Sequence, residues 1–356
     1  CMAVGLNKTE TAVLWKEGEL WFRVPETIKI SLKNRLPEGV YAKDLALWIM
    51  GMLREENVAY KSLEFHGEGV PALSIADRMT LANVTAEMGL KSAAFPPDDK
   101  LADYFGDYAV QGVWADRDAM YYKEFEVDLA QVIPLVMEVG EINEIKAPGE
   151  WGRLEIQQGL IGACASGRLE DLRVVARILD GKKIASGFQL SIVPASREIY
   201  LQAIQEGIID RLVKSGASIL GSSCGPCLGS SHMIMADTRR FITTVNSNSM
   251  RRLSAIGVEK YVASPATVAM TALTGVLTVE VERTDAKYPY WEMPKVWVTV
   301  NEFERRYHNR VWNYGDLNSI ACEQLFDEAC TYRIAPDNFI AIQPYLLAGL
   351  DAYFGI

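Results

Sequence analysis

Apolar and polar residues alternate in different ways along the first part of the chain. Residues 28–32 alternate strictly between apolar and polar side chains, which predicts a half-buried strand. Residues 42–53 follow with the apolar spacing of a helix, and further signals of both kinds run to about Leu135. This pattern predicts an α/β domain over residues 26–145, preceded by residues 1–25, which have the apolar character of the end of another domain.

A strand and helix rhythm repeats three times over residues 146–285, which we expect to form a further domain. A buried strand at 160–163 leads through a loop to a helix around residues 171–179. Further strands are expected at 188–193, 218–220 and 241–245. Strands that alternate with helices favour a parallel sheet, whose ligands gather beyond the carboxyl ends of the strands. The sequence therefore predicts an α/β fold of parallel sheets wrapped by helices.

One long helix is expected after the strand at 188–193. Ser196 is well placed to cap its start, and Gly216 is well placed to end it. Between them, apolar residues recur every four positions, at Tyr200, Ile204, Ile208 and Leu212. This spacing predicts a single helix between Ser196 and Gly216.

Composition and charge narrow the possible partners. The chain of 356 residues has a formal net charge of −10 and no run of Lys or Arg that could neutralise a line of phosphates. Its longest apolar stretches, such as 47–53 and 345–350, are far shorter than the roughly 18 residues that span a bilayer. We therefore expect a soluble, cytoplasmic protein that binds neither nucleic acid nor membrane. Residues 286–356, rich in tryptophan and charge, are expected to be a C-terminal extension.

Three cysteines suggest an inorganic centre. Cys224 and Cys227 flank Gly225 in a Cys-x-x-Cys pair, and glycine lets backbone amides approach a bound sulfur. Cys164 follows a predicted strand, as Cys224 and Asn246 do, so these residues could converge at one edge of the sheet. Three thiolates on a [4Fe-4S] cluster would leave one iron open as a Lewis acid. The spacing alone leaves open a redox pair, a zinc site with His232 as fourth ligand, or ordinary buried thiols.

Several stretches, in order from Cys1 to about Glu282, resemble the large subunits of the aconitase superfamily, of the 3-isopropylmalate dehydratase and homoaconitase type. They are Trp21–Ile28, Lys43–Leu45, Gly162–Leu172, Ser223–Gly229 and Val262–Ala269. The resemblance implies aconitase-like domains with a [4Fe-4S] cluster on Cys164, Cys224 and Cys227 at the carboxyl ends of strands. It also implies a hydro-lyase that acts on a hydroxy-carboxylic acid.

Asn83 and Glu87 form a second candidate group. They lie four residues apart in a predicted helix, residues 77–89, so they share a face. Spacing alone is typical of a solvated face. The resemblance implies instead that both face the open iron, where Glu87 exchanges a proton with bound water and Asn83 orients it. His66, further upstream, is expected to be structural.

The stretch after Asn246 departs from the family pattern. The family has Asn-Arg-Asn there, so Ser247 replaces a substrate-binding arginine, whereas Arg252 aligns with a second arginine. A serine cannot imitate the bidentate clamp that a guanidinium places on a carboxylate. We therefore expect an unusual substrate and tolerance of Ser247→Ala. The resemblance implies a catalytic role for Arg252 and a cluster-binding role for Asn246.

The start of the chain suggests dependence on other polypeptides. By resemblance, Cys1 falls inside the first domain, a few residues beyond the family's Asp-Ser-His-Thr segment, and a swivelling domain is also missing. We expect a second polypeptide that supplies the first-domain segment, and a swivel-domain subunit. Two other functions remain open: an N-terminal-nucleophile hydrolase that uses Cys1 after precursor cleavage, and a cluster-binding regulatory protein. Neither explains why Asn83 and Glu87 accompany three cysteines.

Overall fold

The computed structural model describes residues 2–4, 6–21, 23–106, 112–140, 143–228, 238–247 and 257–279. The chain divides into two compact units, Cys1–Glu282 and Arg283–Ile356, and all described residues lie in the first unit. Cys1, His232, Arg252 and the expected extension 286–356 lie outside the described residues. Within the described ranges, no helix is long and apolar enough to cross a membrane.

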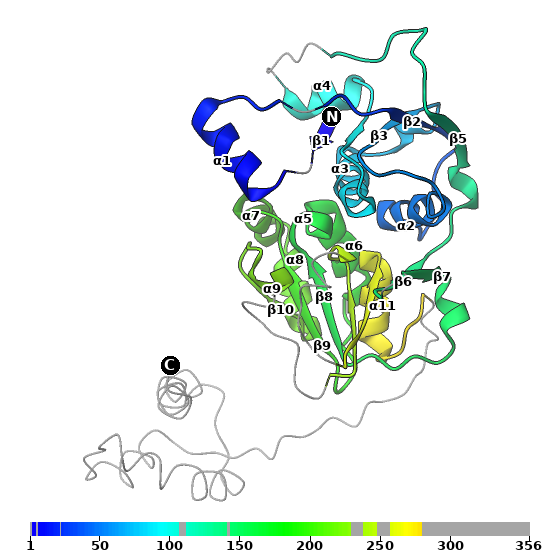
Figure 1. Cartoon of the computed structure of the whole chain (residues 1–356). Helices are drawn as coiled ribbons and strands as arrows, with labels where there is room; N and C mark the ends of the chain where they lie inside the picture. The colour runs from blue at the N-terminus through cyan, green and yellow to red at the C-terminus, as the bar shows by residue number, and fades with distance from the viewer. Residues whose placement is uncertain are drawn as a thin grey trace, which may run out of the picture. The chain divides into compact units, whose positions relative to one another are not determined.

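The first sheet has five strands in the order β1-β4-β3-β2-β5 (Figure 1). Four of them run parallel, and β1 pairs with β4 in the antiparallel direction at one edge. The strands are β1 (Met2–Val4), β2 (Thr27–Lys33), β3 (Ser62–His66), β4 (Ser92–Ala94) and β5 (Lys123–Asp128). The strand expected at 28–32 is therefore confirmed, and β1 joins the sheet of the residues that follow it.

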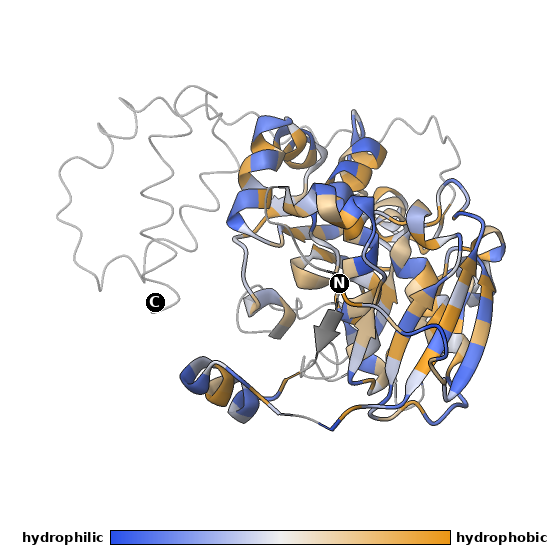
Figure 2. Ribbon diagram, turned by 90° about the horizontal axis from the view of Figure 1, so that it is seen from above, coloured by the Kyte–Doolittle hydropathy of each residue, from blue (hydrophilic) through white to orange (hydrophobic). Residues whose placement is uncertain are grey.

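One face of the first sheet holds its core. Ile28, Ile30 and Leu32 of β2 are fully buried and pack with apolar residues of the helices α2 and α3. Lys29 and Lys33, which alternate with them, lie on the polar face. The helices of this part are α1 (Lys8–Glu17), α2 (Ala42–Met52), α3 (Ile75–Thr85), α4 (Asp99–Phe105), η1 (Val70–Ala72), η2 (Ala86–Met88) and η3 (Leu129–Gln131). Figure 2 shows the resulting banding of hydrophilic and hydrophobic residues along the ribbons.

The second sheet has seven strands in the order β10-β9-β8-β11-β12-β6-β7. The first five strands in this order, β10 to β12, are parallel to one another. β6 pairs with β12 in the antiparallel direction, and β7 pairs with β6 in the antiparallel direction. They are β6 (Val136–Glu138), β7 (Glu144–Lys146), β8 (Gln158–Gly162), β9 (Gln189–Val193), β10 (Ser218–Ile219), β11 (Arg240–Thr243) and β12 (Glu259–Ala263). Two strands that begin before the expected domain boundary at residue 145 thus already belong to this sheet.

Helices pack against the second sheet in an α/β arrangement, as predicted. All five residues of β8 are buried, and apolar residues of α6, α8 and α11 join its core. The helices are η4 (Pro148–Trp151), α5 (Ala163–Ser166), α6 (Leu169–Leu179), α7 (Arg197–Gln205), α8 (Ile208–Ser215), α9 (Gly225–Leu228) and α11 (Pro265–Thr274). Parallel strands buried in this way bring their carboxyl ends together at one edge.

The single helix expected between Ser196 and Gly216 is wrong, because the structure has two helices there. Ser196 does cap α7, since its Oγ accepts a hydrogen bond of 3.2 Å from Ile199 N, and Gly216 does end α8. Between them, Gly207 adopts a left-handed φ of 66° that interrupts the helix. The apolar spacing of four residues continues through this break, so the periodicity hid it.

Candidate active site

Cys164 lies in a sharp turn at the carboxyl end of β8. Gly162 has a φ of 127°, and a Cβ at that position would lie 2.0 Å from the carbonyl oxygen of Val193, so a larger residue does not fit. Ala163 has a φ of 54°, which is uncommon for a residue with a side chain. Such unfavourable backbone tends to be retained at functional sites. The turn leaves Cys164 exposed while Ala163 and Ala165 are buried.

Two buried threonines at the end of β11 hold this turn in place. Thr244 Oγ1 accepts a hydrogen bond of 2.9 Å from Gly162 N, and Thr243 Oγ1 donates one of 2.8 Å to the Leu160 carbonyl. Both threonines have no solvent exposure. These bonds fix the end of β8 relative to the end of β11, which leads to Asn246.

The other two cysteines follow β10. Cys224 is exposed and Cys227 is buried in α9, and all three cysteines are free thiols. Burial raises the pKa of the Cys227 thiol to about 12, with smaller contributions from the charges of Cys164 and Cys224.

The three described cysteines are free thiols, the residue type that holds iron–sulfur clusters and other metal centres. Within the described ranges, no three His, Cys, Asp or Glu side chains converge on one ion. Thiolates around one tetrahedral ion would lie about 3.8 Å apart, since each metal–sulfur bond is about 2.3 Å long. Thiolates on a cubane bind different irons and stand farther apart. A metal would also supply the charge that keeps a buried thiol such as Cys227 deprotonated.

Glu87 contacts the residue after Asn246. Ser247 donates two hydrogen bonds to Glu87 Oε2, from its backbone N and from its Oγ, each 2.9 Å long. Glu87 Oε1 is buried and has no hydrogen-bond partner among the described residues. The sequence predicts that Ser247→Ala is tolerated, because a serine makes no charged clamp, and it gives no sign of these two hydrogen bonds. In the structure, Ser247 holds Glu87 Oε2, while Glu87 Oε1 has no partner among the described residues.

Asn83 and Asn246 form a second contact beside this one. Asn246 Nδ2 donates a hydrogen bond of 2.7 Å to Asn83 Oδ1, and Lys43 Nζ donates one of 3.3 Å to Asn246 Oδ1. Charge interactions also link Lys43 to both Glu87 and Cys164. The structure thus brings together Asn83, Glu87 and Asn246. Lys43 is bonded to Asn246 and interacts electrostatically with Cys164.

Arg168 joins the cysteine turn to the helix that carries Asn83. Its guanidinium donates hydrogen bonds to the Cys164 carbonyl at 2.9 Å, to the Ala165 carbonyl at 3.3 Å and to Thr80 Oγ1 at 3.1 Å. Thr80 lies on α3. Burial raises the pKa of Asp171, the acidic residue that accepts a hydrogen bond from Arg168 N, to about 6.

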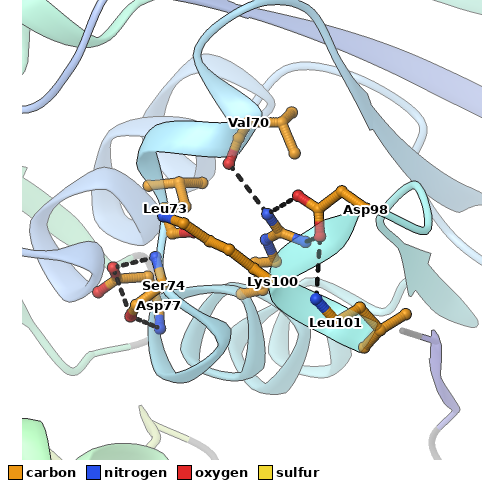
Figure 3. Close-up of polar contacts among 8 residues, drawn as sticks. Val70, Leu73, Ser74, Asp77, Asp98, Lys100 and Leu101 are labelled. Atoms are coloured by element: carbon orange, nitrogen blue, oxygen red, sulfur yellow. Dashed lines mark hydrogen bonds and ion pairs between the residues drawn. The ribbon is translucent and has the colours of Figure 1, made fainter. Parts of the chain in front are cut away.

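A buried ion pair holds the start of α3. Arg78 has no solvent exposure and bonds to both carboxylate oxygens of Asp98 and, at 3.3 Å, to the Val70 carbonyl. Figure 3 shows that the Asp98 carboxylate accepts hydrogen bonds both from the Arg78 guanidinium and from the backbone N of Leu101 at the start of α4. The figure also shows Ser74, which caps α3 in a reciprocal pair of hydrogen bonds with Asp77. The helix that leads to Asn83 and Glu87 is therefore anchored at its first turns.

His66 lies in a separate group on the polar face of the first sheet. Its Nε2 is 3.3 Å from Glu64 Oε2 and 3.3 Å from Tyr121 Oη, and its ring packs against Trp114. These contacts agree with the expectation that His66 is structural. The sequence reasoning gave no role to Lys43, Thr80 or Arg168. One signal in the sequence could have pointed to a special role for Lys43. It lies in the first turn of an apolar helix, and the start of a helix repels positive charge.

Comparison with known proteins identifies a family. The family model "Aconitase family (aconitate hydratase)" matches residues 1–141 and 138–275. A 3-isopropylmalate dehydratase large subunit from Clostridium beijerinckii is 40% identical over 280 residues, which is 78% of this chain and 67% of that protein. Another, from Archaeoglobus fulgidus, is 39% identical over 277 residues, 77% of this chain and 67% of its own length.

A probable methanogen homoaconitase large subunit from Methanosarcina mazei is 39% identical over 279 residues, covering 78% of this chain and 71% of that protein. Among solved structures, aconitase X from Thermococcus kodakaraensis aligns with 66% of this chain and 52% of its own, at a TM-score of 0.39 and 17% identity. At that TM-score the likeness supports no conclusion about function. The matched segment spans about two thirds of the first relatives.

Proposed function

The chain belongs to the aconitase family of hydro-lyases, and from that premise we propose that it holds a [4Fe-4S] cluster on Cys164, Cys224 and Cys227 and dehydrates a hydroxy-carboxylic acid. Dehydratases of this family generally use such a cluster. The observation that carries the proposal is the combination of three free thiols with Glu87, whose Oε1 is buried and has no partner among the described residues.

Glu87 is the proposed acid and base. In dehydration, Glu87 Oε1 gives a proton to the departing hydroxyl as the carbon–oxygen bond breaks, and the hydroxyl leaves as water. In hydration, the same oxygen takes that proton back. The two hydrogen bonds from Ser247 keep Oε2 in place, so that Oε1 is the oxygen that moves the proton. The carbon-bound proton goes to a second base, which we expect on a partner subunit, and its electron pair forms the new double bond.

The cluster and the two asparagines have separate parts in this scheme. When bound, the cluster supplies an open iron that acts as a Lewis acid on the hydroxyl. Asn83 and Asn246, joined by their 2.7 Å hydrogen bond, orient the polar groups around that position. Arg252, outside the described residues, is proposed to bind a carboxylate of the substrate. Ser247 offers no positive charge at the neighbouring position.

We also propose that the chain works with other polypeptides. The relatives are named large subunits, so a small-subunit partner is expected. Trp15 and Trp21 are 84% and 88% exposed, and Val24 beside them is equally open. Exposed apolar residues of this kind are typical of interaction surfaces. A cytoplasmic location stays a prediction.

Metal and sulfide analysis tests the proposal. Anaerobically prepared protein should contain about four irons and four sulfides per chain. Cys224→Ser should lose this content and the brown colour, because a thiolate ligand is removed. Cys322→Ser and Cys330→Ser serve as matched controls and should keep both. Stoichiometric zinc without sulfide would contradict the proposal.

A further inference from the structure

Lys43 is a buried lysine that the proposed reaction does not use. It is the second residue of α2 and is 2% exposed. Two effects make this position unfavourable for an ammonium group: burial removes its hydration, and the start of a helix carries partial positive charge. Burial accordingly lowers the pKa of Lys43. A lysine kept at such a position needs a compensating negative charge.

The described residues give that ammonium a neutral partner at hydrogen-bond distance. Its bond is to Asn246 Oδ1, at 3.3 Å, and within the described ranges no carboxylate lies at ion-pair distance from Nζ. Its charge is therefore not compensated by a local salt bridge in this part of the protein. Lys123, by contrast, has its own carboxylate, Glu56, at 2.5 Å.

The negative groups that do influence Lys43 come from three other elements. They are Glu87 of η2, Cys164 of α5 and Asp171 of α6, and Arg168 opposes them. Lys43 itself comes from a helix of the first sheet, whereas Cys164 follows a strand of the second. The ammonium bonds to Asn246, and the next residue, Ser247, bonds to Glu87, so Lys43 lies beside the proposed catalytic carboxylate in a region with little water to screen its charge.

We propose that Lys43 is the fixed counter-charge of the active site, a positioning residue that stabilises the anionic centre formed by the thiolate-held cluster beside Glu87. The inference rests on the proposed function, because it needs the cluster. Three thiolates and a carboxylate bring more negative charge than the cluster core neutralises, so a buried cation nearby strengthens their retention. The hydrogen bond to Asn246 keeps this cation directed toward the centre.

Two substitutions separate the charge of Lys43 from its hydrogen bond. Lys43→Met removes both, whereas Lys43→Gln removes the charge and keeps an N–H donor for Asn246. Lys61→Met is the matched control, since Lys61 is a buried lysine at the start of β3 with its own partner, Glu26, at 2.6 Å. The full chain, reconstituted with iron and sulfide, is assayed for the rate of cluster loss to a chelator and for the cluster's reduction potential.

Both neutral variants should lose the cluster roughly tenfold or more faster than the parent, in the range known for residues that support metal ligands. Their reduction potentials should fall, because removal of a nearby positive charge disfavours the added electron. Lys61→Met should match the parent in both measurements. Lys43→Arg keeps the charge and should keep the parent's potential.

Several results would overturn the inference. Parent-like loss rates and potentials in Lys43→Met and Lys43→Gln would do so, and so would full recovery in Lys43→Gln, which would assign the role to the hydrogen bond. If a neutral variant does not fold, a potential for Lys43→Arg well below the parent's would decide against it. A parent that takes up no iron and sulfide would refute the proposed function itself. A parent protein that binds the cluster, together with Lys43 variants whose loss rates and potentials equal the parent's, would refute this inference alone.

Discussion

The polar face of the first sheet and the strand β8 of the second sheet differ in how far their polar groups are exposed to water. On the polar face of the first sheet, Lys29 pairs with Glu124 at 2.9 Å and Lys33 with Glu126 at 2.6 Å, all close to solvent. Such exposed pairs contribute about 0–1 kcal/mol each. In the second sheet, β8 is buried at every position, and the polar groups at its carboxyl end are enclosed. Interactions that are removed from water are stronger and more costly to lose.

This difference in exposure indicates where substitution of a charged residue should affect activity or stability. Lys43 and Glu87, from helices of the first sheet, contact Asn246 and Ser247, which follow β11 of the second sheet. The first region thus supplies the proposed proton-transfer group and the proposed counter-charge, and the second supplies the thiols. Charge on the open face of the first sheet should be dispensable, and charge at the junction should not be.

Of the substitutions that test this difference between the two regions, Glu87→Gln should have the largest effect on activity. It should lower kcat by about 10²- to 10⁴-fold with the cluster retained, because a positioned general acid and base typically contributes that much. Steady-state kinetics with matched iron content provide the measurement. Glu126→Gln, on the open face of the first sheet, is the control and should leave kcat unchanged. Full activity in Glu87→Gln would remove Glu87 from the mechanism.

Arg78→Met should have the next largest effect, on stability. It leaves the partly exposed Asp98 without its buried partner, and the loss of hydrogen bonds to a charged group should lower the unfolding free energy by about 1.5–3 kcal/mol. Chemical denaturation measures the loss. Lys33→Met breaks an exposed pair of the same sheet and should cost about 1 kcal/mol or less. Equal costs for the two variants would break the distinction between buried and exposed charge.

Ser247→Ala should reduce activity more modestly. It removes one of the two hydrogen bonds to Glu87 Oε2 and leaves the backbone bond in place. A hydrogen bond to a charged group is worth about 1.5–3 kcal/mol, so kcat should fall roughly 10- to 100-fold. Ser215→Ala, which removes a buried hydroxyl bonded to the Leu212 carbonyl, should leave kcat alone. Parent-like kinetics would restore the expectation that Ser247 is tolerant.

Asp171→Asn should produce the smallest effect, visible as a change in pH dependence. The folded pKa of Asp171 is raised to about 6 from 3.8, so folding favours the protonated form. The stability from this group is present below about pH 3.8 and is lost as pH rises through about 6. The variant should match the parent near pH 4 and exceed it by about 1–3 kcal/mol above pH 7. Parallel Tm profiles for the two proteins would contradict this.

Periodicity predicted most elements of the fold. The strand at 28–32 and the helix at 42–53 correspond to β2 and α2, because one face of each is buried and the apolar residues show it. The break at Gly207 was missed, because an apolar pattern shared by two successive helices does not reveal that the backbone changes direction.

The site was less accessible to sequence reasoning. Resemblance pointed to Asn83 and Glu87, but their contacts with Asn246 and Ser247 join residues 163 and 160 positions apart, which no local pattern reports. Lys43 was recognised within a motif without a function, since a sequence does not show that a lysine is buried. Arg168 was missed because its partners at Cys164 and Ala165 are backbone carbonyls, which are the same for every residue type.

The bridge made by Arg168 has a consequence for how the protein matures. One guanidinium binds the carbonyl of a cysteine that is proposed to hold the cluster and, at the same time, the hydroxyl of Thr80 on α3. If cluster binding strengthens this bridge, cofactor insertion and the docking of α3 are linked equilibria, and each favours the other by the same factor. An unloaded chain should be more readily cut by proteases around α3, so cluster assembly would also serve as a final step of folding.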